Sequence, residues 1–224
     1  MSDQTTSSKA LDRPIDRDFD FEIMPGVPAG LPKGEDILWQ GKPQAKALAR
    51  EAYKINWILA YMLVIVLWRA GGAYADGGSA LMLATALPYL ALAGAGYAVI
   101  YALAWAQARA SIYTITSARV IMRIGAALPV TYTIPFLRIA TARLDLRPGG
   151  TGTIALEITD GVRLSFAVLW PHLRPGFAKH TQPAFRCIPD AQNVARLLAD
   201  AAQAKLNEPV VTAAAPSGAV MAAE

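Results

Sequence analysis

Residues 79–108 read SALMLATALPYLALAGAGYAVIYALAWAQA and contain no Lys, Arg, Asp, Glu or His. A helix needs about 20 predominantly apolar residues to cross a bilayer, so this stretch predicts a transmembrane helix, and membrane helices tolerate a proline such as Pro88. A second apolar stretch, residues 54–75, is interrupted by Arg69. The fourteen residues before Arg69 could alone form a buried core helix, but aromatic residues at both ends of the stretch favour a second span. The sequence therefore predicts a membrane hairpin of two helices.

Basic residues flank this hairpin on its outer sides. The loop between the two stretches carries only Arg69 and Asp76, whereas the flanks carry Lys42, Lys46, Arg50, Lys54, Arg109, Arg119 and Arg123. The positive-inside rule then predicts a multi-pass protein of the cytoplasmic (inner) or intracytoplasmic membrane, with both termini cytoplasmic. An intramembrane arginine can mark a functional site, and one near a helix end can instead extend to the headgroups, which we expect for Arg69.

Small residues recur along the second stretch at helical spacing. They predict a face on which another helix, the first one or a partner's, could pack closely, unless they only reflect an alanine-rich chain. The residues of this predicted transmembrane packing face are Ala84, Ala91, Ala95 and Ala98. Neither stretch contains histidine, which usually ligates the metal of a haem or chlorophyll, so we expect no pigment bound within the membrane. We also expect no other cofactor.

The composition of the whole chain excludes several classes of protein. Of the 224 residues, 54% are apolar and only 17% are charged, with a net charge of +4. Cys187 is the only cysteine and His172 and His180 are the only histidines, which excludes a disulfide-stapled domain and leaves too few ligands for a Cys/His zinc site. We expect mostly disordered ends, an acidic N-terminal arm at 1–33 and a tail at 207–224.

After the hairpin, the pattern changes to short alternating segments separated by turn residues, which is typical of antiparallel strands. The helical pattern returns near the C-terminus, where Asp190 is suited to cap a helix over 190–206. This helix could close the open end of a small antiparallel barrel or curled sheet formed within residues 109–206. The predicted strands are 111–116, 119–124, 130–135, 139–146, 153–158 and 162–169.

No catalytic constellation is found, so we expect a protein that is not an enzyme. The GGTG segment at 149–152 lies between two predicted strands and is better explained as a hairpin turn than as a phosphate loop. His172, in LWPHLRP, favours a structural or interface role over general base catalysis. Cys187 is expected to be buried.

Several motifs resemble a known family. GEDILWQGKP at 34–43 and YTITSARVIMRIG at 113–125, placed on either side of the hairpin, resemble the bacterial pleckstrin-homology-like (bPH) domain. The additional segments FDFEIMPGVP, GTGTIALEI, LWPHLRP and FRCIPDAQNVARLLADA are similar to those of the PuhB family of photosynthetic complex assembly proteins of purple bacteria. The resemblance covers about residues 19–206. It implies a membrane α-hairpin plus a β-rich domain, a pleckstrin-homology-like antiparallel barrel of about seven strands whose first strand lies at 34–43.

The same resemblance implies a role in assembling the photosynthetic reaction centre, with reaction-centre subunits and membrane lipids as partners. Net charges of −4 for residues 1–36 and +7 for residues 109–205 also suit a module that binds anionic lipid or an envelope-stress partner. We expect no nucleic acid partner and allow for a homo-oligomer. Trp and Arg are enriched in binding hot spots, so the candidate partner or lipid contacts are Trp39, Arg123, Arg143, Arg147, Trp170 and Arg174. His172 is added to them for its possible interface role.

Overall fold

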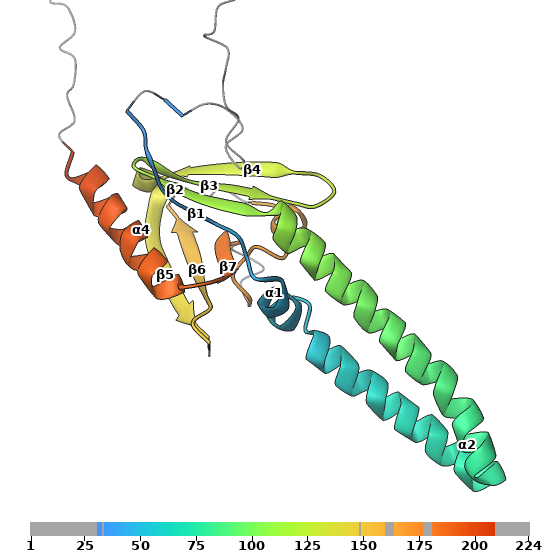
Figure 1. Cartoon of the computed structure of the whole chain (residues 1–224). Helices are drawn as coiled ribbons and strands as arrows, with labels where there is room; N and C mark the ends of the chain where they lie inside the picture. The colour runs from blue at the N-terminus through green and yellow to red at the C-terminus, as the bar shows by residue number, and fades with distance from the viewer. Residues whose placement is uncertain (1–30, 33, 148, 160–163, 177–180, 209–224) are drawn as a thin grey trace, which may run out of the picture.

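The computed structural model of the chain describes residues 31–32, 34–147, 149–159, 164–176 and 181–208. A hairpin of apolar helix extends from a β-rich domain that is built of two sheets and a C-terminal helix (Figure 1). The predicted N-terminal arm lies almost entirely outside the described residues, as does nearly all of the predicted C-terminal tail.

The first sheet has the strand order β1-β2-β3-β4, and every neighbouring pair is antiparallel. The first strand, which only the family resemblance indicated, pairs with the strand that follows the hairpin. The strands are β1 (Ile37–Gly41), β2 (Ile112–Thr116), β3 (Arg119–Ile124) and β4 (Val130–Pro135).

The second sheet has the order β5-β6-β7 and is also antiparallel. A short 3-10 helix, η2 (Phe136–Arg138), turns the chain from one sheet into the other directly after Pro135. The strands of this second sheet are β5 (Ile139–Leu146), β6 (Gly152–Ile158) and β7 (Ala184–Ile188).

Two details of the predicted β domain are wrong. Among the described residues the strands form two separate sheets rather than a closed barrel, because η2 breaks the pairing between β4 and β5. The predicted strand 162–169 is not seen either: residues 162–163 lie outside the described residues, and Phe166–Leu169 form a helical turn, α3. The seventh strand is instead β7, within a segment that the sequence indicated only as a proline-rich link.

A single hydrophobic core joins the two sheets to α4 (Ala191–Leu206). The helix buries the predicted apolar stripe, with Val194, Leu198 and Ala201 in the core and Leu197 packed against it. Asp190 precedes the helix as predicted, but it has a left-handed backbone and makes no capping hydrogen bond. Its carboxylate instead accepts two hydrogen bonds from the Asn193 amide, so the predicted cap is wrong in its chemistry.

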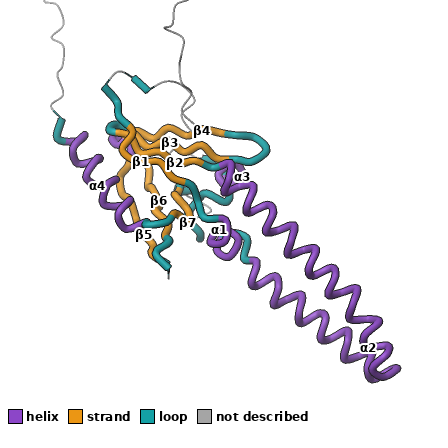
Figure 2. Tube along the Cα trace, viewed as in Figure 1, coloured by secondary structure: helices purple, strands orange, loops and turns teal. Residues whose placement is uncertain are grey.

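The apolar hairpin is formed by α2 (Ile55–Ala110), the helix in the described part of the chain that is long and apolar enough to cross a membrane. The helical backbone breaks at Gly77 and Gly78, where φ of +71° at Gly78 favours glycine, and the chain reverses (Figure 2). At 1.5 Å per residue, the first arm (55–76) is about 33 Å long and the second arm (79–110) about 48 Å long. The Arg69 guanidinium lies over the Tyr89 ring of the other arm, 5.9 Å from its centroid.

A short helix, α1 (Ala45–Glu51), fills the space beside the longer second arm. Its Leu48 packs against Ala108, and its Ala49 packs against Ala104 of the second arm. The backbone N–H of Gln44, just before α1, donates to the carbonyl of Cys187 at 2.8 Å. The base of the hairpin is thereby joined to β7.

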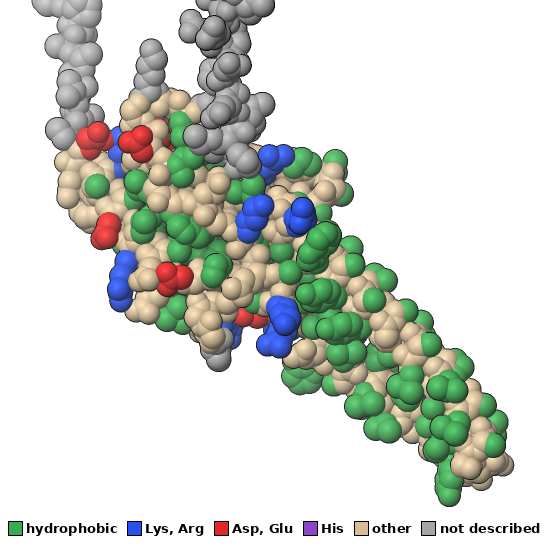
Figure 3. Space-filling model, in the orientation of Figure 1, with side chains coloured by type: hydrophobic (Ala, Val, Ile, Leu, Met, Phe, Trp, Pro, Cys, Tyr) green, Lys and Arg blue, Asp and Glu red, His purple; other side chains and the backbone are tan. Residues whose placement is uncertain are grey.

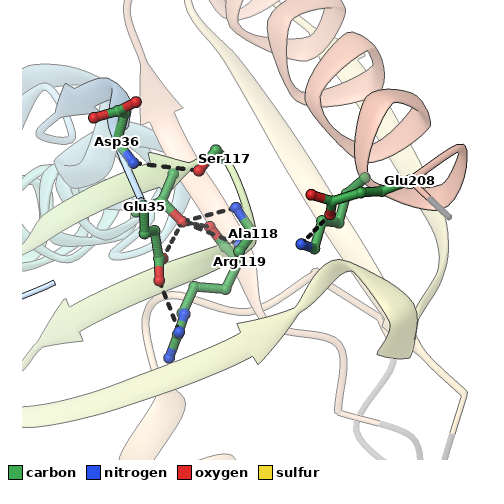
Figure 4. Close-up of polar contacts among 8 residues, drawn as sticks. Glu35, Asp36, Ser117, Ala118, Arg119 and Glu208 are labelled. Atoms are coloured by element: carbon green, nitrogen blue, oxygen red, sulfur yellow. Dashed lines mark hydrogen bonds and ion pairs between the residues drawn. The ribbon is translucent and has the colours of Figure 1, made fainter. Parts of the chain in front are cut away.

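At the opposite end of the first sheet, a buried carboxylate fixes the start of β1. Glu35 accepts hydrogen bonds from the Thr116 hydroxyl at 2.6 Å and from the Arg119 guanidinium at 2.7 Å (Figure 4). The Ser117 hydroxyl accepts a hydrogen bond from the backbone N–H of Asp36. These contacts hold the chain before β1 against the β2–β3 turn.

Candidate docking site at the open edge of the second sheet

The strand β5 is unusually exposed for an element of the domain. All residues from Ala140 to Leu146 are exposed, including Leu144 at 38% and Leu146 at 49% of their surface. In β6, by contrast, the residues paired with the middle of β5 are buried, among them Ile154 opposite Leu144. The apolar face of β5 therefore continues the core outward next to α4, and its two leucines stay partly exposed.

The backbone of β5 also has unused hydrogen-bonding groups at its outer edge. In the turn after β5, the backbone N–H of Arg147 donates to the carbonyl of Thr151 at 2.8 Å, so Arg147 directs its backbone polar groups towards β6. Because these directions alternate along a strand, Ala142, Leu144 and Leu146 direct theirs away from β6. No hydrogen bond joins them to another described residue. An edge of this kind is a template for strand addition.

Two of the predicted contact residues, Arg143 and Arg147, lie at this edge. Arg143 is 59% exposed in its side chain and stands 4.0 Å from the Glu157 carboxylate. Arg147 donates to Asp145 at 2.9 Å and lies 3.7 Å from Glu51 of α1. The outer face of the edge therefore carries alternating charges, and its inner face carries leucines.

Three other predicted contacts lie apart from this edge. Trp39 is half-buried and packs against the core, where it stacks on Phe185 with ring centroids 6.0 Å apart, so its role as a contact stays a prediction. Arg123 is half-buried in β3 and pairs with Thr131 of β4 in the register of the first sheet. Arg174 is also half-buried and donates to the Gln182 side-chain carbonyl at 3.1 Å.

His172 is buried, with 1% of its surface exposed, so the prediction that it contacts a partner is wrong. Its Nε2 lies 3.0 Å from the Ser111 hydroxyl, and its Nδ1 lies 2.6 Å from the Tyr113 hydroxyl. Ser111 donates to the Gln107 carbonyl, and Tyr113 accepts from the backbone N–H of Arg186. A neutral imidazole that donates from Nε2 to the Ser111 hydroxyl and accepts at Nδ1 from the Tyr113 hydroxyl gives both ring nitrogens and both hydroxyls a hydrogen-bond partner.

Electrostatics also keep this network neutral. Burial, together with the charge of Arg186, lowers the pKa of His172 to about 3, and burial raises the pKa of Tyr113 above its usual value. Burial likewise raises the pKa of Cys187 to about 12. Neither a general base nor a reactive thiolate is available here near neutral pH, and the network ties the second arm to the domain. The sequence predicted the structural role of His172 but not these partners.

Trp170 lies at the base of the hairpin. It is 40% exposed and packs edge-on against Tyr53, with ring centroids 4.9 Å apart. Tyr53 lies two residues before the first arm, so Trp170 belongs to the surface around the hairpin and not to the edge at β5.

The predicted packing face of small residues is not the face on which the two arms meet. All its members are exposed, whereas the second arm turns a different set of partly buried residues towards the first. Use of this face by the first arm is therefore wrong, and its use by a partner's helix stays a prediction. The exposed residues are Ala84, Ala91, Ala95 and Ala98.

Sequence reasoning missed the leucines of the edge and the carboxylate of Glu51. Leu144 and Leu146 follow the alternation that predicts a buried face, yet they are 38% and 49% exposed in the described part of the chain, on a strand at the edge of its sheet. Glu51 lies within 4.0 Å of both Arg147 and Arg186, two residues far from it in sequence. In the described part of the chain, no group of three or more His, Cys, Asp or Glu side chains could hold a metal ion.

The chain matches the bacterial PH domain family over residues 58–202. This range includes most of the hairpin, both sheets from β2 onward and most of α4. The chain is also 54% identical over 209 residues to an uncharacterized 23.7 kDa protein in the puhA 5' region of Rhodobacter capsulatus, which corresponds to 92% of this chain and 98% of that protein. No solved structure matches the chain significantly.

Proposed function

Because the chain belongs to the bacterial PH domain family, we propose that it is a non-enzymatic, membrane-anchored assembly factor for the photosynthetic reaction centre. The position of its Rhodobacter capsulatus relative in the puhA 5' region supports this role, together with the resemblance to photosynthetic complex assembly proteins. In this proposal the protein acts by contacts with reaction-centre subunits at the cytoplasmic face of the membrane.

The hairpin of α2 supplies the anchor. Both arms are long enough to cross a hydrocarbon core of about 30 Å. Basic residues flank the hairpin at the end where it meets the domain, which favours a two-pass topology with both termini in the cytoplasm. Arg69 and Asp76 are the charged residues of the opposite end, close to the turn at Gly77 and Gly78.

The observation that carries the docking function is the open edge of β5. A segment of a reaction-centre subunit, added as a strand, would pair with the free backbone groups of Ala142, Leu144 and Leu146. Its apolar side chains would cover the two leucines beside α4, and its polar side chains would meet Arg143 and Arg147. Backbone pairing supplies affinity, and the side chains on the two faces supply specificity.

A pair of substitutions at one position tests this site. Proline at position 142 removes an N–H that points away from β6, so the pairing of β5 with β6 is kept while an added strand loses a donor. Valine at the same position keeps the N–H and suits a strand. In a phototrophic host that lacks the native gene, Ala142→Pro should lower reaction-centre levels and Ala142→Val should restore them.

Capture of reaction-centre subunits by the tagged protein from solubilised membranes gives the second readout. We expect Ala142→Pro to accumulate in the membrane normally but to lose this capture. Unchanged reaction-centre levels after deletion of the gene would overturn the assembly function. Undiminished capture by Ala142→Pro would overturn the edge as the docking site and leave the assembly function standing.

A further inference from the structure

The helical turn α3 presents apolar side chains to the outside of the domain. Phe166 is 45% exposed, Val168 44% and Trp170 40%, while Leu169 between them is fully buried. Backbone hydrogen bonds from Leu169 to Ser165 and from Trp170 to Phe166 hold the turn. This exposed surface is therefore a fixed feature of the fold.

Contacts place this turn where both arms of the hairpin join the domain. Trp170 packs against Tyr53, two residues before the first arm begins. Two residues after Trp170, His172 bonds to Ser111, which follows the last residue of the second arm. Figure 2 shows α3 beside the domain end of α2. The apolar turn thus lies at the level at which the hairpin leaves the domain.

The β3–β4 turn presents a further apolar side chain at this end of the domain. Ile112, just after the second arm, pairs with Arg123 near the end of β3, so the turn that follows projects beyond the first residue of β2. Leu128 in this turn is 81% exposed. Gly125 has φ of +102°, and a Cβ there would lie 2.2 Å from the Leu128 carbonyl oxygen, so the turn is tightly formed around Leu128.

The charges around the base of the hairpin suit an anionic surface. Lysine and arginine side chains gather on the side of the domain from which the hairpin extends, and many acidic side chains lie on the opposite side (Figure 3). Within residues 42–54 the one acidic residue, Glu51, faces Arg147 and Arg186 of the domain. The exposed basic residues adjoining the hairpin are Lys42, Lys46, Arg50, Lys54 and Arg109.

We propose that α3 and the β3–β4 turn rest in the headgroup region of the bilayer that α2 crosses, with Phe166, Val168, Trp170 and Leu128 entering the interface and the surrounding basic residues binding anionic lipid. Aromatic and apolar side chains beside basic ones are typical of segments that lie in a membrane interface. The occupant of this surface is the bilayer because the surface is continuous with the hairpin. The inference rests on the proposed membrane anchor and not on the docking role of β5.

Fluorescent labels on the full chain in lipid nanodiscs test the contact. A single new cysteine, at Val168→Cys, Leu128→Cys or Leu206→Cys, carries the environment-sensitive dye NBD, and the buried native Cys187 does not compete for the label. Leu206 is the matched control, a 56% exposed leucine at the far end of α4. Nanodiscs contain phosphatidylcholine with or without phosphatidylglycerol, and doxyl-labelled lipids quench dyes that reach the interface.

We expect lipid quenching at positions 168 and 128 that is several-fold stronger than at 206, stronger with phosphatidylglycerol and weaker at high salt. A Phe166→Glu substitution should reduce quenching at position 128 while Cys187 stays protected from thiol reagents, which shows that the domain is still folded. Equal quenching at all three positions would overturn the proposal. The proposal would also be overturned if the dye at position 168 reported an apolar environment only after addition of solubilised reaction-centre subunits, because the surface would then bind protein and not lipid. Neither result bears on reaction-centre levels, so failure here is separable from failure of the assembly function.

Discussion

Replacing His172 by leucine should destabilise the domain at neutral pH and remove part of its sensitivity to acid. Leucine leaves the Tyr113 O–H without the acceptor that lies 2.6 Å away in the native protein. The Ser111 hydroxyl keeps its bond to the Gln107 carbonyl, so one buried donor is orphaned. Such a group costs about 1–3 kcal/mol, and the free energy of unfolding at pH 7.5 should fall by about that amount.

The pH dependence follows from the lowered pKa of His172. The unfolded chain binds a proton on this histidine below about pH 6.5, whereas the folded chain binds it only near pH 3. The contribution of His172 to the free energy of unfolding is therefore complete above pH 6.5. It falls by about 1.4 kcal/mol for each pH unit below 6.5, until the histidine is protonated in the folded protein as well. At pH 5 the free energy of unfolding of the unsubstituted protein is about 2 kcal/mol lower than above pH 6.5 because of His172. His172→Leu has no such loss, so the free energies of unfolding of the two proteins should converge at this pH.

Urea unfolding of the full chain in detergent micelles, at intervals from pH 8 to pH 4.5, measures this difference. Other groups titrate in both proteins, so their contribution cancels in the comparison. A stability difference that stays constant from pH 8 to pH 5 would refute the neutral, buried state assigned to His172.

Three further outcomes follow from the packing of the domain. Glu35→Ala should lower the free energy of unfolding by about 1–3 kcal/mol because it removes the buried acceptor of two hydrogen bonds, whereas Asp36→Ala should change it by less than about 0.5 kcal/mol in the same urea titration. Cys187, buried and with its pKa raised to about 12, should resist N-ethylmaleimide at pH 8 until the chain is unfolded, and mass spectrometry would reveal premature labelling. Gly152→Ala should destabilise the domain by at least about 1 kcal/mol because its Cβ would lie 2.6 Å from a side chain of α4, whereas Gly71→Ala, which meets nothing within 4 Å in α2, should not.

The strands that sequence alternation predicted best are those bounded by short turns. The bounds of β3, β4 and β5 coincide with the predicted ranges 119–124, 130–135 and 139–146. In β3 the alternation has a direct cause, because Val120, Met122 and Ile124 enter the core. Local pattern and burial agree in β3, so for this strand the sequence contains the information needed.

The pattern fails between residues 162 and 188 because burial there does not follow a period of two. Phe166 and Val168 look like one face of a strand, but the chain turns helically and buries only Leu169 of α3. All five residues of β7 are buried, and prolines stand just outside both of its ends, so it shows neither alternation nor a typical boundary. Contacts with α1 complete the burial of β7, and these depend on residues more than 100 positions away.

The proposed docking edge at β5 could be predicted only in part, for a related reason. Arginine is a common hot-spot residue, which was enough to select Arg143 and Arg147. Leu144 and Leu146 lie on an edge strand because the sheet has the order β5-β6-β7. The sequence pattern alone does not show which strands pair with each other, so it does not predict this order. For His172 the sequence left a structural and an interface role open, and the structure shows the structural one, a buried link to the hairpin.

The direction of β5 restricts which chain can occupy its edge. β5 begins after η2, where Phe136 bonds to Ala118 of the β2–β3 turn, and ends beside the base of the hairpin, where Arg147 approaches Glu51. It therefore runs towards the side from which α2 extends (Figure 1). A second copy added antiparallel at this edge would direct its hairpin the opposite way, so the two could not share one membrane. Antiparallel pairing of two copies at β5 is therefore not expected to give a homo-oligomer within one membrane, which favours the proposed occupant, a strand from a reaction-centre subunit.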